Sequence, residues 1–415
     1  MNRYLAILVL IMGMIAFSGC SSNPSKSSNG IVLRNFQKPG DAVTQLEMTS
    51  GDRLYIGWAA MNSIELTATT STQPSRVYVS AYDGKALSPL GGVVGTVNSV
   101  FTLGFYNNSP VIAMVDTTET IIVKQWSGNT WTDIGTLPLA NVSDTVVALS
   151  RITATANNLY IAYGERFATG AAVINVYRFD GSNWHALPSP AVIPSGSYLF
   201  SLDMAILNDN PVVIWMAGSD STGKETIPVM QWNGTQWVTL SDNMKIYSTP
   251  WLMSMGSSSC SITGMPGGIA VMWNEGMPFT DSTGMMSDLP IGIVSTYNGT
   301  QWTQLGTVNR DEPGIATDDR DAEQLKGLWI NSRLYIAFVE MAQVYLAYNG
   351  TNGFGYVGDS LNAHPYALLG NPVYIADSPS IVRYNGETYL SFIEEMRDQN
   401  TMTISYNPYI RGISQ

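Results

Sequence analysis

Residues 231–237 read QWNGTQW, and this arrangement returns along the chain: an aromatic residue, then Asn, Asp or Ser before Gly, two further residues, and Trp. The other full copies are QWSGNTW at 125–131, RFDGSNW at 178–184 and TYNGTQW at 296–302, and shorter copies without the Trp are AYDG at 81–84 and AYNG at 347–350. Asn-Gly and Asp-Gly favour type I′ hairpin turns, which need a positive φ at both central residues. Each copy therefore predicts a β-hairpin with a Trp on the returning strand.

A second phrase, a short continuous apolar run, occurs seven times. The copies are Leu54–Trp58, Pro110–Met114, Leu159–Tyr163, Pro211–Trp215, Ile269–Trp273, Leu334–Phe338 and Thr388–Phe392. Such runs are typical of strands buried on both faces. Each run follows a turn, and an alternating run such as 200–207 comes before that turn.

These phrases define one unit of four antiparallel strands, which we name A to D in chain order. Seven such units predict an all-β fold, a seven-bladed β-propeller of four-stranded antiparallel blades. The seventh unit has strands A to C from about Ser380 to Tyr406 but no Trp-bearing strand D. We expect the β-prone segment Ile31–Phe36 to close this blade by pairing beside Thr401–Tyr406, because a closed ring leaves no bare sheet edge. An open or six-bladed arrangement is the alternative.

The phrase that joins strands C and D resembles the repeats of kelch and galactose-oxidase-type propellers, most closely at residues 176–188. Those repeats also carry an aromatic residue before the turn and a Trp on strand D. No unit here has the Gly-Gly doublet that ends strand B in kelch repeats. The resemblance implies a fold, and a fold does not give a function.

The N-terminus is a targeting segment. Arg3 precedes an apolar stretch, Tyr4–Phe17, which is short for a membrane span and long enough for a signal peptide. The following Ser-Gly-Cys resembles the lipobox of bacterial lipoproteins, which implies cleavage before Cys20 and acylation (palmitate) of its thiol. The alternative is an ordinary secretory signal. We therefore expect a signal peptide at 1–19, a flexible tether at 20–30 and one propeller domain at 31–415.

Composition narrows the functional classes. A lipid-modified Cys20 leaves Cys260 as the only other cysteine, so no intramolecular disulfide forms and a large core must stabilise the fold. The net charge of −12 argues against a nucleic-acid partner, because phosphates require basic patches. The membrane partner is then reached through the lipid. Ser21 after Cys20 resembles the pattern for outer-membrane sorting, so we expect an outer-membrane or cell-surface location.

The candidate binding residues are carboxylates that follow strand B in five of the seven units. They are Asp116, Glu165, Glu275, Glu340 and Glu394. Connections between strands B and C and between D and A emerge on one face, so these side chains are expected around the mouth of the central channel. Their summed field would hold a cation or a positively charged ligand. The alternative is that each carboxylate caps loop amides or faces water.

Metal binding has two weaker candidates, and no other cofactor is expected. Asp318, Asp319 and Asp321 supply clustered oxygens that suit calcium, although their spacing matches no EF-hand and a solvated loop is the alternative. Methionines of the fifth unit near Cys260 supply soft ligands for copper(I). Methionine is also ordinary core material.

Two functional hypotheses remain. The first is a binding or scaffold protein that uses loops 241–257, 306–322 and 358–379 on the acid-bearing face. Tyr247, Trp251, Tyr366 and Tyr374 would there give stacking surfaces for a protein or glycan partner. The second is a carbohydrate-active enzyme with paired carboxylates such as Glu275 and Glu340. We favour binding, because the two histidines, His185 and His364, are not expected to converge and no G-x-S-x-G motif occurs.

Overall fold

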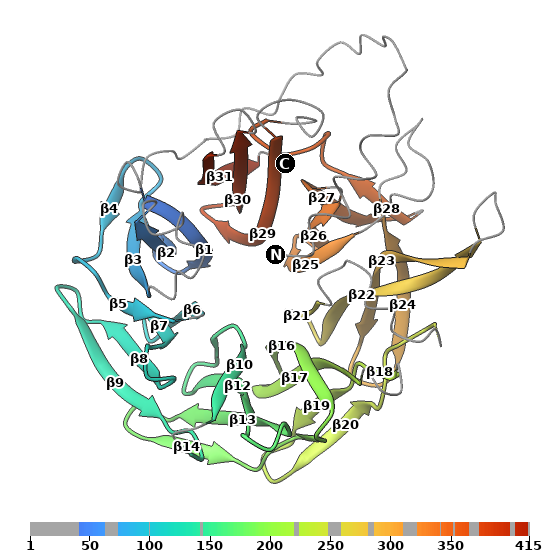
Figure 1. Cartoon of the computed structure of the whole chain (residues 1–415), viewed down its shortest axis with the longest axis horizontal. Coiled ribbons are helices and arrows are strands. Elements are labelled where there is room, and N and C mark those ends of the chain that lie inside the picture. Colours follow the sequence, from blue (N-terminus) through green and yellow to red (C-terminus); the bar gives the residue numbers. More distant parts are fainter. Residues whose placement is uncertain are drawn as a thin grey trace.

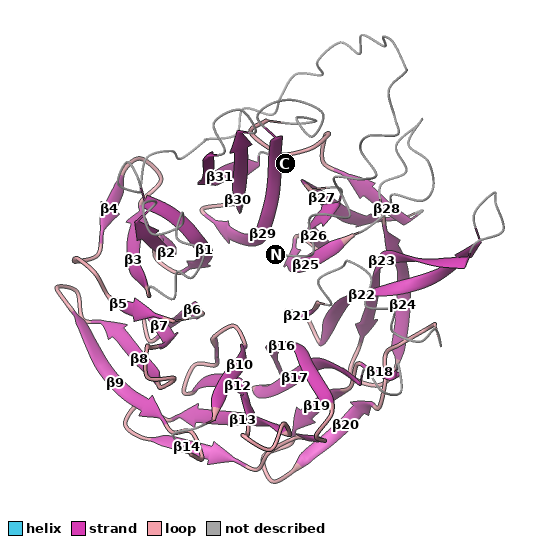
Figure 2. Cartoon of the chain, viewed as in Figure 1, coloured by secondary structure: helices cyan, strands magenta, loops and turns pink. Residues whose placement is uncertain are grey.

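The computed structural model describes residues 41–62, 74–98, 100–141, 144–219, 224–247, 259–280, 286–309, 322–340, 342–351, 353–364, 373–398 and 403–413. Within these ranges all regular secondary structure is β-strand (Figure 2). No helix of the described residues is long and apolar enough to cross a membrane.

Seven antiparallel sheets stand side by side in a ring, so the chain is a seven-bladed β-propeller (Figure 1). The first strand of each sheet lies towards the middle of the ring and the last towards its outside. The predicted fold class is confirmed, and the six-bladed alternative is wrong.

The first four blades have the following main strands in order from A to D. Blade 1 contains β1 (Asp41–Ser50), β2 (Leu54–Asn62), β3 (Ser75–Tyr82) and β4 (Leu87–Pro89); blade 2 contains β6 (Phe101–Tyr106), β7 (Ser109–Val115), β8 (Ile121–Trp126) and β9 (Trp131–Leu137); blade 3 contains β10 (Thr145–Leu149), β12 (Leu159–Arg166), β13 (Ala172–Phe179) and β14 (Trp184–Leu187); blade 4 contains β16 (Ser197–Leu207), β17 (Asn210–Ser219), β19 (Val229–Trp232) and β20 (Trp237–Ser241).

The remaining blades and four short strands complete the description. Blade 5 contains β21 (Cys260–Met265), β22 (Gly268–Thr280), β23 (Met286–Tyr297) and β24 (Trp302–Val308); blade 6 contains β25 (Glu323–Ile330), β26 (Arg333–Glu340), β27 (Gln343–Gly350) and β28 (Gly353–Tyr356); blade 7 contains β29 (Val373–Tyr384), β30 (Glu387–Asp398) and β31 (Thr403–Ile413). The short strands β5 (Gly95–Val97), β11 (Thr153–Ala154), β15 (Val192–Ile193) and β18 (Lys224–Thr226) pair with β3, β12, β13 and β17.

All seven predicted apolar runs lie in the B strands β2, β7, β12, β17, β22, β26 and β30. The last blade differs in its bounds from the expectation, because β29 begins at Val373 and β31 extends to Ile413. The segment Ile31–Phe36 lies outside the described residues, so closure of this blade by the N-terminal strand stays a prediction.

The predicted turn type is wrong for the hairpins that join strands C and D in blades 1 to 5. Four residues separate Phe179 from its partner Trp184, and the carboxylate of Asp180 accepts hydrogen bonds from the amides of Ser182 and Asn183. Only the glycine of this turn, Gly181, has a positive φ. An Asx-type turn therefore closes the hairpin.

The pair of positive φ angles occurs instead between strands A and B. Asn107 and Asn108 have φ of 48° and 59°, and Asn208 and Asp209 have 51° and 59°. Asn and Asp tolerate this backbone region better than most other residues, which explains their use between strands A and B. Between strands C and D the Asx side chain serves instead as a hydrogen-bond acceptor.

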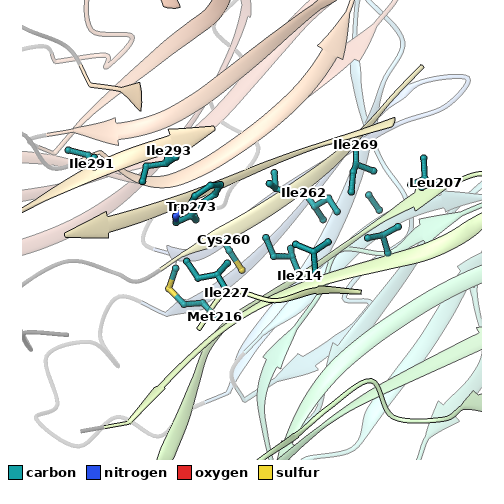
Figure 3. Packing of buried hydrophobic residues seen from close by; sticks show 14 residues of the cluster. Leu207, Ile214, Met216, Ile227, Cys260, Ile262, Ile269, Trp273, Ile291 and Ile293 are labelled. Atoms are coloured by element: carbon teal, nitrogen blue, oxygen red, sulfur yellow. The ribbon is translucent and has the colours of Figure 1, made fainter. Parts of the chain in front are cut away.

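The hydrophobic core is divided among the interfaces between neighbouring blades. Seven clusters of buried side chains each combine two adjacent blades, and Figure 3 shows the one between blades 4 and 5, where Ile214 and Met216 meet Cys260 and Trp273. One cluster joins Leu46 of β1 to Tyr389 of β30. Side-chain packing therefore closes the ring between its first and last blades.

The repeated Trp of strand D connects each of blades 2 to 5 to the blade before it. Its indole Nε1–H donates to a main-chain carbonyl at the outer edge of the preceding blade in all four full copies. The pairs are Trp131 to Leu90, Trp184 to Ile134, Trp237 to Pro188 and Trp302 to Leu240, at 2.9, 3.0, 2.5 and 2.9 Å. Blade 6 lacks this Trp, and the Tyr356 hydroxyl donates to the carbonyl of Asn309 instead at 2.6 Å. The motif that reveals the repeat thus also holds neighbouring blades in register.

Candidate functional site

The carboxylates that follow strand B are for the most part buried and hydrogen-bonded. Glu165, Glu275, Glu340 and Glu394 are at most 4% exposed, and only Asp116 is half-buried. Asp116 accepts hydrogen bonds through Oδ1 from the amides of Thr118 and Thr120 in its own loop. These side chains do not form the solvated acidic ring that the sequence led us to expect.

Glu275 shows what the buried members do. Its Oε1 accepts a hydrogen bond from the amide of Tyr247 at 2.6 Å, and its Oε2 accepts from the amide of Ile246 at 3.0 Å and from Trp273 Nε1 at 3.1 Å. Burial raises the pKa of this carboxyl, although the three donors oppose the shift. The side chain therefore anchors the connection that enters blade 5.

Two other members anchor loops in the same way. Glu165 accepts from the amide of Ala140 and from Asn175 Nδ2, and burial raises its pKa. Glu394 accepts from the amide of Ala363 at 2.6 Å, and its Oε2 lies 2.9 Å from His364 Nδ1. These hydrogen bonds match the alternative interpretation, that the carboxylates cap loop amides. Glu340 is buried at the end of β26, where it pairs in register with Gln343.

The predicted aromatic surface is only partly described. Tyr247 is half-buried and packs on the core between blades 4 and 5, and Tyr374 lies within β29, stacked on His364 with ring centroids 4.0 Å apart. Neither is an exposed loop side chain. Because Tyr374 lies in a strand, the expectation that residues 358–379 form one loop is wrong. Trp251 and Tyr366 lie outside the described residues.

The metal candidates gain no support from the described part of the chain. No group of three potential ligands among His, Cys, Asp and Glu occurs there, and Asp318, Asp319 and Asp321 lie outside it. Burial raises the pKa of the Cys260 thiol to about 12, which keeps it protonated, whereas a metal requires the thiolate. Met272 and Cys260 pack in different core clusters, so they do not converge.

A different polar site occupies the central channel. A cavity of about 310 Å³ runs between the inner strands of blades 1, 2, 3, 4, 6 and 7. Its lining includes five charged side chains, which come from five different blades: Glu47, Arg151, Asp203, Lys326 and Arg383. Such convergence makes the channel the candidate functional site.

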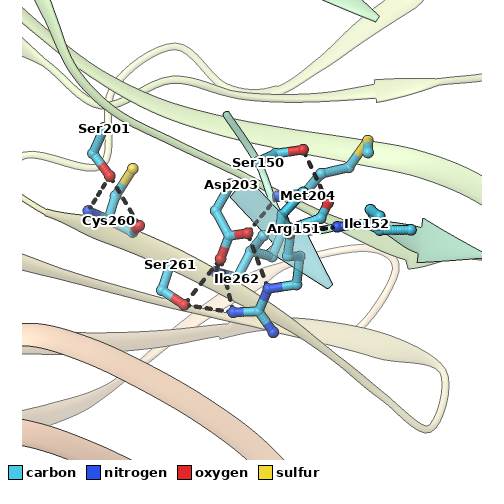
Figure 4. Close-up of polar contacts among 10 residues, drawn as sticks. Ser150, Arg151, Ile152, Ser201, Asp203, Met204, Cys260, Ser261 and Ile262 are labelled. Atoms are coloured by element: carbon cyan, nitrogen blue, oxygen red, sulfur yellow. Dashed lines mark hydrogen bonds and ion pairs between the residues drawn. The ribbon is translucent and has the colours of Figure 1, made fainter. Parts of the chain in front are cut away.

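Arg151 and Asp203 form the fixed part of this site (Figure 4). Arg151 donates from Nε to Oδ1 of Asp203 at 3.0 Å and from Nη2 to Oδ2 at 2.8 Å. Ser261 bonds to both partners, and the amides of Met204 and Ile262 complete the shell around the carboxylate. Burial opposes ionisation of Asp203, but Arg151, Lys326 and these hydrogen bonds outweigh it and hold its pKa below the usual value.

Glu47 and Lys326 form the less constrained part. Both are half-buried, and Lys326 makes no hydrogen bond or ion pair with the described residues. Burial raises the pKa of Glu47, which Lys326 and Arg151 only partly offset. A carboxyl that resists ionisation thus shares the channel with an ammonium group that lacks a close partner.

Sequence reasoning missed this site because it searched the ends of strand B rather than the A strands. A signal was present: Glu47, Asp203 and Lys326 each interrupt an otherwise apolar or small-residue run on strand A. Charges are rare inside strands that face a core unless they are paired or line a cavity.

No protein-family model and no curated protein matches this sequence. Among solved structures, a protein of unknown function from Dyadobacter fermentans is similar, with a TM-score of 0.50, 8% identity, and coverage of 93% of this chain and 99% of that one. The six-bladed fucose-recognising lectin of Aleuria aurantia has a TM-score of 0.46 and 13% identity, with 78% and 99% coverage. A Trypanosoma rangeli sialidase solved with sialic acid has a TM-score of 0.47 and 10% identity, with 92% and 59% coverage. At these identities the likeness shows the β-propeller fold alone.

Proposed function

We propose that this protein is an extracytoplasmic binding or scaffold lipoprotein. In this proposal acyl chains on Cys20 hold it at the outer membrane or cell surface, and one face of its propeller meets a protein or glycan partner. The observation that carries the proposal is the unequal length of the connections on the two faces of the ring.

One face carries mostly tight turns, those between strands A and B and between C and D. Examples are residues 208–209 and 233–236. The three longest connections, 242–259, 309–322 and 357–372, all join strand D of one blade to strand A of the next and therefore emerge on the opposite face. Insertions that interrupt a repeat usually gather on the binding face, because loops vary freely on a rigid scaffold.

The alternative, a carbohydrate-active enzyme with Glu275 and Glu340 as its acid and base, is less well supported. A general acid or base must lie within hydrogen-bonding reach of the substrate. Both oxygens of Glu275 are already occupied by N–H donors that hold the loop at Ile246 and Tyr247. Glu340 is 4% exposed. These carboxylates fit a structural role, which favours binding over catalysis.

Two experiments test the partner. Purified mature protein is screened on a glycan array, and a photo-crosslinking amino acid is placed at Trp251 or Tyr366 in the native cells, with the exposed Val238 on the outer strand β20 as the control position. Either a glycan bound through the long connections, and lost in a Trp251→Ala, Tyr366→Ala double variant, or a crosslink specific to residues 251 and 366 supports the proposal. No array binding together with equal crosslinking at all three positions would overturn it.

The anchor is tested separately. Labelled palmitate is expected to enter the wild-type protein and to be absent from a Cys20→Ala variant, which should leave the detergent phase on phase separation. Stable anchoring needs more than one acyl chain or added surface charge, so loss of the Cys20 lipids should release an acidic protein completely. Equal membrane association of both proteins would contradict a lipid anchor.

A further inference from the structure

The charge inside the channel is opposite in sign to that of the whole protein. The chain has a net charge of −12, yet the side chains that line the channel cavity include three cations and two acids. The cations are Arg151, Lys326 and Arg383. A concave site bounded by protein focuses such a field, so the cavity attracts anions that the outer surface repels.

Not all of these charges are available to a ligand. Asp203 already accepts hydrogen bonds from Arg151, Ser261 and two backbone amides, so its charge is compensated. Nε and Nη2 of Arg151 donate to Asp203, and Nη2 also donates to Ser261. The third guanidinium nitrogen, Nη1, makes no hydrogen bond within the described residues (Figure 4). The side chain remains 33% exposed, towards the channel.

Arg383 is exposed and donates from Nη1 to Oδ1 of Asn331, so Nη1 of Arg151 and Nζ of Lys326 are the donors considered for an incoming group. An ammonium and a guanidinium edge are the groups that bind carboxylates in proteins, and such charge-assisted hydrogen bonds are about twice as strong as neutral ones. Glu47 faces both cations across the same cavity. Its carboxyl oxygens can accept hydrogen bonds from hydroxyls of a ligand in that cavity.

The rest of the wall suits a small hydroxylated molecule. Thr49, Ser50 and Ser380 bring hydroxyl groups to the cavity, and Leu103 and Ile381 bring apolar surface for the carbon-bound faces of a ring. A volume of about 310 Å³ lies at the lower end of the range for ligand pockets. It matches a single sugar-sized molecule better than a chain of them.

We infer that the central channel binds a small hydroxylated carboxylate of the sugar-acid type, with its carboxylate on Lys326 and Arg151 and its hydroxyls towards Glu47. This inference goes beyond the proposed function and does not depend on it, because it concerns the channel and not the long connections on one face.

The test is calorimetric titration of the mature protein with glucuronate, galacturonate and gluconate, with glucose as the neutral control. At least one acid is expected to bind and glucose is not. Lys326→Met should weaken that binding by about tenfold or more, because it removes a charged hydrogen bond at nearly constant volume. Lys326→Arg, which keeps the charge, should retain most of it. Lys85→Met alters an exposed lysine in a turn of blade 1 and should change nothing.

The inference is overturned if none of the acids binds up to about 10 mM, if glucose binds as well as the acids, or if the Lys326→Met protein binds as tightly as the wild type. Competition by sulfate at equal concentration would show a general anion site and would overturn the sugar-acid class. The thermal midpoint of each variant is recorded to confirm that it is folded. Array binding and crosslinking through residues 251 and 366 should be unchanged by Lys326→Met, so the two proposals fail independently.

Discussion

Nε and Nη2 of Arg151 face the two carboxylate oxygens of Asp203 at 3.0 and 2.8 Å, and this bidentate ion pair joins blade 3 to blade 4 at the wall of the channel. Ser261 on β21 donates to Asp203 as well, so the same carboxylate also reaches blade 5. Arg151 and Asp203 both line the channel cavity. The pair is therefore both a structural link and part of the candidate site.

Asp203→Asn should destabilise the fold strongly. Removing one partner of a buried ion pair leaves the other charge uncompensated, and the expected loss is about 3 kcal/mol, at the low end because Arg151 is partly exposed. Urea unfolding measures this free energy. Because the pKa of Asp203 is lowered in the folded state, its contribution is present above the unfolded pKa and is lost as the pH falls towards the folded value. The difference between wild type and variant should therefore narrow in acid.

The matched control is Asp133→Asn. Asp133 pairs with Lys124 at 3.4 Å on the outer strands, where the carboxylate is exposed. Exposed ion pairs contribute less than about 1 kcal/mol, so this variant should remain close to the wild type. Equal losses in the two variants would show that the Arg151–Asp203 pair is no more important than a surface pair.

Trp302→Phe tests the bond that fastens blade 5 to blade 4. Phenylalanine keeps most of the ring contacts but cannot donate to the carbonyl of Leu240, so the free energy of unfolding should fall by about 1 kcal/mol. Trp126→Phe is the control, because the indole N–H of Trp126 makes no hydrogen bond within the described residues. Chemical unfolding of both variants measures the difference. If both substitutions cost the same, the indole hydrogen bond adds nothing to ring packing.

The contact between Trp302 and Leu240 also shows which features of the fold could be predicted from the sequence. The Trp residues mark where strands β9, β14, β20 and β24 begin, and the apolar runs mark the B strands, because both patterns are local. The acceptor of each indole lies on another blade, 41 to 62 residues earlier in the chain, and no local pattern specifies that pairing. The type of the turns between strands C and D was predicted wrongly for a related reason, since Asn-Gly and Asp-Gly serve both a two-residue and a four-residue hairpin.

Local patterns mark the individual charged residues of the channel, but they do not specify that these residues meet, for the same physical cause. Glu47, Asp203 and Lys326 are far apart in sequence and meet only because the ring closes. The carboxylates after strand B do occur at equivalent positions in the blades, as the sequence pattern predicts. Most of them are buried, however, and cap loop amides instead of facing a ligand. A charged residue at a strand end looks the same in sequence whether it faces water or caps an amide, because the difference lies in the loop that folds over it.

Glu275→Gln tests that capping role together with the expectation that the carboxylates after strand B hold a cation. The amide that replaces one oxygen is a donor facing donors from Tyr247 or Ile246, so the variant should lose about 2 kcal/mol of stability. Asp116→Asn keeps an acceptor oxygen on a half-buried loop and should lose less than about 1 kcal/mol. Thermal unfolding of each protein is recorded with calcium and with EDTA. A calcium-dependent rise of the wild-type midpoint that Glu275→Gln abolishes would mean that Glu275 binds the metal instead.

Glu47→Gln should stabilise the protein at neutral pH. The folded-state pKa of Glu47 is raised by burial, which Lys326 and Arg151 only partly offset, with Asp203 adding to the increase. The native state therefore holds this proton at pH values where the unfolded chain has released it. Stability consequently falls as the pH rises from the pKa of the unfolded chain, about 4.3, through the pKa of the folded protein.

Glutamine does not titrate, so the variant escapes this loss and should unfold at a higher urea concentration than the wild type at pH 7. The difference in stability between the two proteins should disappear near pH 4. Urea unfolding of both proteins across that pH range measures the effect. If the variant is less stable than the wild type at pH 7, Lys326 and Arg151 must stabilise the ionised carboxylate of Glu47. The channel would then be a balanced network of ion pairs without excess positive charge.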